Sequence, residues 1–229
     1  MENNLNPYIV YGLYIGTALL GGAVAYQVSV MFFYVDMFLW IMGIIYNVKP
    51  IRSKDIPFVD VISESVNNAI RLLLGWFIVS SSYLPPVSII IGYWLAGAFL
   101  MAIKRYAEYR MINNPETAAL YRKSFKYYTD KSLLISSFFY AMGSVLFVGI
   151  FLIRYRIELI LFMPVFIGLF CYYFFISFKE DSAAQKPEKL FHEKGLMLYC
   201  LMLCLLFLGL MLVDIPHINA LISNSLIRI

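Results

Sequence analysis

Residues 8–46 read YIVYGLYIGTALLGGAVAYQVSVMFFYVDMFLWIMGIIY, an almost uninterrupted apolar stretch. As a single helix it would measure about 58 Å, roughly twice the thickness of the hydrocarbon core of a bilayer. The stretch therefore has to fold back on itself. Gln27 and Ser29 supply the polar side chains near its middle. We predict two membrane spans, over 8–26 and 30–46, joined by a turn at these residues.

The rest of the chain has the same character. Of its 229 residues 62% are hydrophobic and 14% are charged, which is typical of an integral membrane protein. Nothing in it resembles a nucleic-acid-binding motif, and we expect no nucleic-acid partner. We predict an all-α polytopic bundle of about seven transmembrane helices, in one domain over residues 1–229. The further spans are expected at 57–80, 86–103, 132–153, 159–178 and 195–213, and the tail 214–229 is predicted to form a weakly amphipathic interfacial helix.

Lysine and arginine side chains gather in the loops on one side of this seven-span arrangement. The loops around residues 49–54, 104–131 and 179–194 carry most of them, whereas the other side has Arg154, Arg156 and Arg228. By the positive-inside rule, the large polar loops are predicted to be cytoplasmic and the protein to lie in the plasma membrane.

The predicted helix over Pro57 to Ser80 carries Asp60, Glu64, Asn67 and Arg71. At about 100° per residue, these four positions fall within an arc of roughly 60° on one helix face. An ionisable side chain costs about 2.5 to 3.5 kcal/mol at mid-membrane, so the stripe predicts the lining of an internal site. The alternative is an internal ion-pair ladder that fixes helix packing.

Two further clusters are predicted to meet the stripe on the cytoplasmic side. They consist of Lys49, Arg52 and Lys54 in the first loop, and of Lys104, Arg105 and Glu108 at the end of the fourth span. Cations beside carboxylates suit a magnesium-chelated diphosphate, because Lys and Arg neutralise phosphate oxygens while carboxylates hold the metal. Such a pocket would take an amphiphile with a phosphate head and an isoprenoid tail. Each cluster also has a simpler interpretation, as a membrane anchor for the first and an ordinary i, i+4 pair of Lys104 with Glu108 for the second.

Four segments together resemble UbiA-type membrane prenyltransferases. They are YNVKPIR at 46–52, DIPFVDV at 55–61, RLLLG at 71–75, and KRYAE at 104–108. The last segment stands where many members have a second aspartate-rich motif, and it is closer to the decaprenyl-phosphate phosphoribosyltransferase branch. The resemblance covers about residues 7–213.

This resemblance implies a nine-helix bundle with a central cavity and a Mg²⁺-dependent transfer in which diphosphate leaves an activated carbon. The expected substrates are an isoprenoid lipid phosphate and a phosphorylated donor, either phosphoribosyl pyrophosphate or a prenyl diphosphate. Lys104 and Arg105 would then hold donor phosphates, Glu108 would assist metal or ribose binding, and Asp60 and Arg71 would shape the pocket. From the clusters alone, Lys49, Arg52 and Lys54 are candidate phosphate-binding residues, Asn67 is a pocket-lining one, and the candidate catalytic residues are Asp60, Glu64 and Arg71.

One family motif has no counterpart in the chain. The family places Asn-Asp-x-x-Asp between its second and third helices, so about two spans and the main metal ligands are expected to be absent here. A shortened gene model, a separate polypeptide that supplies these helices, and a degenerate homologue would each explain this. Two other functions therefore stay open: an aromatic prenyltransferase that uses a prenyl diphosphate, and a non-catalytic lipid-binding or assembly subunit or small-solute carrier.

Overall fold

The computed structural model describes residues 6–179, 182–185, 187–215 and 218. Within them every regular element is a helix, and there is no strand. The α-helices are α1 (Pro7–Val28), α2 (Val30–Asn47), α3 (Val59–Val79), α4 (Val87–Ile112), α5 (Pro115–Tyr121), α6 (Asp130–Tyr155), α7 (Met163–Ser177), α8 (Pro187–Leu190) and α9 (Lys194–Leu212). Short 3₁₀ helices join them, namely η1 (Ser53–Asp55), η2 (Lys123–Tyr127), η3 (Ile157–Phe162) and η4 (Ala183–Gln185).

This architecture confirms the all-α polytopic fold expected from the sequence. Among the described residues, six segments are long and apolar enough to cross a membrane, and they correspond to α1, α2, α4, α6, η3 with α7, and α9. Helix α3 has 21 residues and is long enough to span, but it carries the polar stripe. Most of the predicted tail, 214–229, lies outside the described residues.

Polar side chains set several helix ends. Ser29 separates α1 from α2, and its hydroxyl accepts a hydrogen bond from the backbone N–H of Phe32. This confirms the predicted turn, because a serine cap satisfies an N–H that the first helical turn leaves unpaired. Asn114 caps α5 in the same way, and Thr129 forms a reciprocal capping box with Ser132 at the start of α6.

Helix α3 begins two residues later than predicted. Pro57 was expected to open the helix, but the first helical residue is Val59. Phe58 precedes it with φ at 63°, in the left-handed half of the backbone map. The N–H of Phe58 donates to the hydroxyl of Tyr128, and the two rings pack edge to face. A contact across 70 residues therefore fixes the entry into α3.

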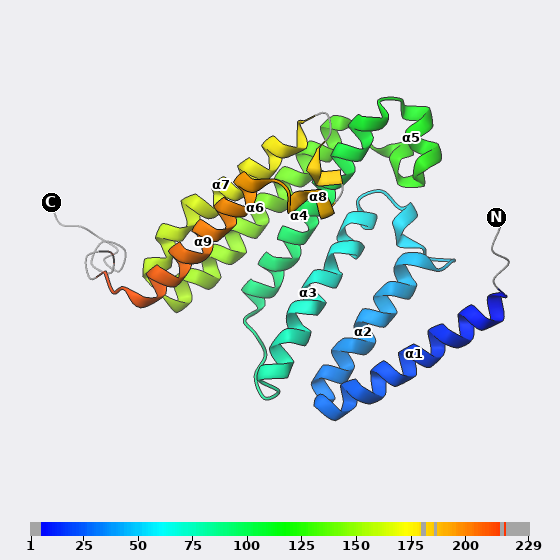
Figure 1. Ribbon diagram of the computed structural model, residues 1–229, viewed down its shortest axis with the longest axis horizontal. Helices are drawn as coiled ribbons and strands as arrows, with labels where there is room; N and C mark the ends of the chain where they lie inside the picture. Colours follow the sequence, from blue (N-terminus) through cyan, green and yellow to red (C-terminus); the bar gives the residue numbers. More distant parts are fainter. Residues whose placement is uncertain (1–5, 180–181, 186, 216–217, 219–229) are drawn as a thin grey trace.

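Helices α1 to α4 lie side by side in chain order, and α6, α7 and α9 gather beyond α4 (Figure 1). The most extensive packing is between α4 and α6. There a Cβ on Gly92 would stand 2.8 Å from a Val148 methyl carbon and 3.1 Å from the Val148 nitrogen, and the hydroxyl of Ser144 donates to the Gly92 carbonyl at 2.9 Å. A glycine is required at this crossing because only hydrogen leaves room for the neighbouring backbone.

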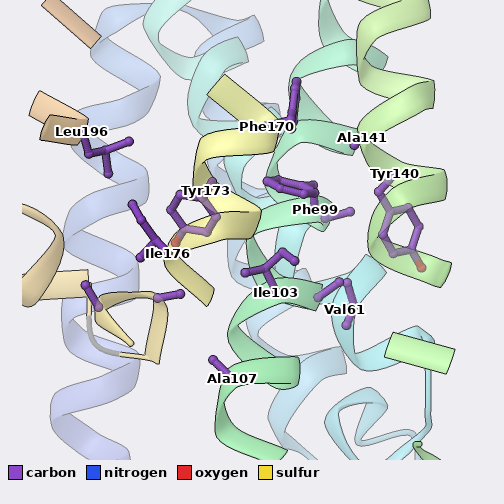
Figure 2. Packing of buried hydrophobic residues seen from close by; sticks show 14 residues of the cluster. Val61, Phe99, Ile103, Ala107, Tyr140, Ala141, Phe170, Tyr173, Ile176 and Leu196 are labelled. Carbon is purple, nitrogen blue, oxygen red and sulfur yellow. The ribbon is translucent and has the colours of Figure 1, made fainter. Parts of the chain in front are cut away.

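The apolar core surrounds α4. Figure 2 shows Phe99 between the side chains of α7 and those of α6, and its ring lies edge to face on Phe170, with the centroids 4.7 Å apart. Helices α1 and α2 stand apart from this core. Among the described side chains, α2 has none that is fully buried, and α1 buries only Gly22 and Ala25. The charged residues are positioned by the packing of α2, α3 and α4.

Candidate functional site

Polar and charged side chains converge at the end of the bundle where α5 lies. They come from the last turn of α2, the first turns of α3, the last third of α4, and the segment that contains η2. We call them the charged cluster. Its members are Tyr46, Asp60, Glu64, Arg105, Glu108, Arg122, Ser124 and Tyr128.

Arg105 is the centre of the charged cluster. Its side chain is 3% exposed, and its Nη2 and Nη1 donate to Glu64 and Glu108, the latter at 3.0 Å. Its Nε lies 3.7 Å from Oδ2 of Asp60, which makes an ion pair but no hydrogen bond. An uncompensated charge at this burial costs several kcal/mol, so these carboxylates hold the guanidinium in place.

Asp60 is the most deeply buried of the carboxylates, at 0% exposure. Its Oδ1 accepts from the hydroxyl of Tyr128 at 2.6 Å, and its Oδ2 accepts from the hydroxyl of Ser124 at 3.1 Å. The Nε of Arg122 stands 3.3 Å from the same Oδ2. Both oxygens are therefore committed to partners on the chain, and the segment 122–128 is tied to α3.

Tyr46 links the two halves of the charged cluster. Its hydroxyl donates to Oε2 of Glu64 at 2.7 Å and accepts from Nη2 of Arg122 at 3.0 Å. Since Nη2 of Arg105 donates to the same Glu64 oxygen, this carboxylate lies where donors from α2 and α4 meet. Charge-assisted bonds of this kind are roughly twice as strong as neutral ones.

Tyr128 lies outside the membrane-spanning helices and has a raised pKa. Burial is the largest cause, followed by the charge of Asp60 and the hydrogen bond to it. Each disfavours the phenolate, so Tyr128 stays protonated and donates to Asp60 throughout the physiological range.

The structure brings together four of the residues that the sequence singled out, namely Asp60, Glu64, Arg105 and Glu108. Arg71 is not among them. It lies on the same face of α3 but eleven residues beyond Asp60, which is about 16 Å along the helix axis. Its guanidinium is exposed and donates to Asn68 at 3.3 Å.

The other predicted residues lie at or near this end without joining the charged cluster. Asn67 is half-buried, and its side-chain oxygen has no hydrogen-bond partner among the described residues. Arg52 pairs with Asp55 at 3.3 Å, and Lys54 donates to Asn47 at 3.0 Å. Lys49 is exposed.

Lys104 differs from these cations. It is half-buried, and within the described part of the chain no ion pair or hydrogen bond satisfies its ammonium group. A half-buried cation without a partner is available to an anionic ligand.

The sequence interpretation missed Arg122, Tyr46, Ser124 and Tyr128. They lie at the end of the second span or in the loop around 104–131, which the sequence marks only as rich in lysine and arginine, yet Ser124 is fully buried and Arg122 reaches into the charged cluster. The signal that the sequence offered was the mixture of aromatic and basic residues in this segment. Phe125 is 1% exposed, and it fixes the segment against α4 by packing on Tyr109.

The acidic oxygens do not fit a Mg²⁺ site in this arrangement. Mg²⁺ binds carboxylate oxygens and water in a near-octahedral shell, and adjacent guanidinium groups compete for those oxygens. Asp60, Glu64 and Glu108 each face an arginine. Within residues 6–179, 182–185 and 187–215, no three acidic, histidine or cysteine side chains are grouped to hold a metal ion. The role of Mg²⁺ remains a prediction from the sequence.

An apolar groove of 510 Å³ opens between α3 and α4, farther along the bundle. We call it the Arg71 groove. It is lined by Arg71, Leu72, Gly75, Trp76, Val79, Ser80 and Tyr93. A hydrocarbon chain in this groove would have one cation at its wall.

The model of the UbiA prenyltransferase family matches residues 2–201. No curated protein and no solved structure matches the chain. The family match covers most of the 229 residues, including α1 to α7 and the whole charged cluster. The chain therefore belongs to the UbiA prenyltransferase family.

Proposed function

We propose that the protein is a membrane-embedded transferase that acts on an isoprenoid lipid phosphate, with loss of diphosphate from the donor. The observation that carries this proposal is the charged cluster at one end of long apolar helices, with the Arg71 groove farther along α3 and α4. A substrate with an anionic head and a long hydrocarbon tail needs both environments.

Lys104 supports the phosphate-binding part of the proposal. Its ammonium group has no partner among the described residues, and it directly precedes the central Arg105 in α4. In a half-buried setting an ammonium gains more from a phosphate than it does in water, because the local dielectric is lower. Lys104 would therefore hold a donor phosphate beside the charged cluster.

We favour phosphoribosyl transfer over prenyl transfer. An oxygen of the lipid phosphate would form a bond to C1 of phosphoribosyl pyrophosphate while the bond from C1 to diphosphate breaks, giving a lipid-linked ribose phosphate and free diphosphate. The support is the end of α4, where Lys104, Arg105 and Glu108 stand in KRYAE in place of a run of aspartates. An aromatic prenyltransferase remains the alternative within the same chemistry.

The site would face the cytoplasm, where phosphorylated sugar donors are made. The end of the bundle that holds the charged cluster also holds Lys49, Lys54, Lys123, Lys126 and Lys131, and cytoplasmic loops are enriched in such residues. A separate membrane polypeptide that supplies further helices would be a partner, since α1 and α2 bury few of their side chains.

The test is transfer by the purified protein in lipid or detergent, together with any such partner. We expect lipid-linked ribose phosphate from radiolabelled phosphoribosyl pyrophosphate, polyprenyl phosphate and Mg²⁺. Lys104→Ala should raise KM for the donor about tenfold or more, since one charge-assisted bond contributes about 1.5 to 3 kcal/mol. Lys131→Ala is the matched control, because Lys131 is exposed at the same end of the bundle. Labelled product that forms only from a radiolabelled prenyl diphosphate and an aromatic acceptor would favour the aromatic prenyltransferase.

A non-catalytic lipid-binding subunit is a second candidate. It is favoured by the internal pairing of Asp60, whose two oxygens are both engaged by groups of the same chain. In that case the protein would bind polyprenyl phosphate, but neither donor would be consumed under any of these conditions.

A further inference from the structure

Glu64 is the most exposed carboxylate of the charged cluster. Its side chain is 28% exposed, compared with 12% for Glu108 and 0% for Asp60. Among the described residues, only Arg105 and Tyr46 bind it, and both bind the same oxygen, Oε2. Asp60, in contrast, is held through both oxygens by Tyr128 and Ser124. Glu108 accepts one bond, from Arg105, but its side chain is more enclosed, so Glu64 is the carboxylate of the charged cluster with the most open path to solvent.

The groups around Oε2 of Glu64 would suit a phosphate oxygen equally well. Nη2 of Arg105 and the hydroxyl of Tyr46 both donate to this single point. Behind them, Nη2 of Arg122 donates to the hydroxyl of Tyr46 at 3.0 Å, which orients the hydroxyl proton toward the acceptor. Two converging donors, one of them a guanidinium, form a typical anion-binding arrangement.

We propose that Arg105, Tyr46 and Arg122 form a phosphate seat, and that Glu64 fills it only while no phosphate is bound. The incoming phosphate would displace the Glu64 carboxylate toward solvent and take over its two donors. This inference rests on the proposed function for the identity of the phosphate, which would belong to the diphosphate group of the donor. Glu64 would thus be an internal competitor of the substrate rather than a metal ligand.

The two roles for Glu64 predict opposite results. If Glu64 holds Mg²⁺ for a diphosphate, removal of its charge weakens diphosphate binding. If Glu64 occupies the seat, removal of its charge strengthens binding, because an anion no longer has to be displaced and the negative charge beside the seat is gone. The sign of the effect therefore separates them.

The experiment measures binding of inorganic pyrophosphate by titration calorimetry, with the full chain in detergent, with EDTA and then with Mg²⁺. We expect Glu64→Gln and Glu64→Ala to lower the Kd at least about tenfold, the equivalent of 1.4 kcal/mol. Glu116→Gln is the control. It removes the same charge from the first turn of α5, where Glu116 is exposed and stands outside the charged cluster. Tyr46→Phe in the Glu64→Gln background should cancel most of the gain, because it removes one of the two donors.

An unchanged or higher Kd in both Glu64 variants would overturn the inference. Should neither variant fold, the wild-type protein gives the answer. Modification of Glu64 by a water-soluble carbodiimide and glycine ethyl ester should increase when pyrophosphate is bound, and modification that stays constant or falls would refute displacement. Tighter pyrophosphate binding without any transfer activity would leave the seat in place and reject the proposed reaction. Transfer activity without tighter pyrophosphate binding in the Glu64 variants would reject the phosphate seat and leave the proposed reaction in place.

Discussion

Replacement of Asp60 by asparagine tests the charged cluster most directly. The substitution keeps the size of the side chain but removes the charge that faces Arg105 at 3.7 Å and Arg122 at 3.3 Å. Breaking a buried ion pair by removing one partner costs about 3 to 5 kcal/mol. Arg105 keeps Glu64 and Glu108, so the cost arises mainly at Arg122, whose side chain is 19% exposed and can be partly hydrated. We therefore expect the lower end of this range, about 3 kcal/mol.

The assay is thermal unfolding in detergent, followed by tryptophan fluorescence. For a chain of this length, 3 kcal/mol lowers Tm by about 6 to 12 °C. Asp55→Asn is the matched control, because Asp55 also faces two cations, Arg52 at 3.3 Å and Lys123 at 3.7 Å, but its side chain is 26% exposed, compared with 0% for Asp60, and Lys123 is 70% exposed. Such pairs contribute about 0 to 1 kcal/mol. If Asp60→Asn and Asp55→Asn lowered Tm equally, burial would not determine the strength of these pairs and our reasoning would be wrong.

Two further predictions concern the packing around the site. Tyr128→Phe removes the hydroxyl that donates to Asp60 and accepts from a backbone N–H, and should cost about 1 to 3 kcal/mol in the same assay. The pKa of Tyr128 is raised in the folded state, so above about pH 10 the hydroxyl ionises first in the unfolded chain. The difference in stability between wild type and Tyr128→Phe should therefore be constant below about pH 10 and shrink above it. A stability difference that stays constant to about pH 11 would contradict the raised pKa. Gly92→Ala should cost about 1 to 3 kcal/mol by forcing α4 away from Val148, whereas Gly75→Ala, with open space around its Cα, should be neutral or slightly stabilising. Equal Tm values for these two glycine variants would mean that the crossing of α4 and α6 is not tight.

The sequence predicted the helices better than it predicted the site. The sequence located the end of α1 at Ser29, because a serine between two apolar runs is a favoured capping residue at the start of a helix. The start of α3 was misplaced at Pro57, since the left-handed conformation of Phe58 depends on Tyr128, which is far away in sequence. Local signals identify helix ends well only where the capping groups are themselves local.

The polar stripe on α3 shows the same limit at the level of the site. Helical periodicity placed Asp60, Glu64 and Arg71 on one face, and the first two do meet Arg105. Periodicity gives the direction of a side chain but not which neighbour is present at its level along the helix, so it did not show that Arg71 lies apart from the charged cluster. Arg122 had no periodic signal at all, because it enters the charged cluster from the extended residue between α5 and η2, and tertiary packing sets the path of the chain there.

The pairing of α3 with α4 has a consequence for biosynthesis. Glu64 is made 41 residues before Arg105, and Asp60 is made earlier still, so α3 leaves the ribosome before any of its neutralising arginines exists. Arg71 stands near the middle of α3, where a charged residue costs about 2.5 to 3.5 kcal/mol, and Asp60 and Glu64 add unpaired charges near one end, so α3 is a poor substrate for insertion by itself. It is also absent from the six segments that are apolar enough to span. We therefore expect α3 to wait at the membrane entry site until α4 arrives, so that the two helices enter the bilayer as a neutralised pair.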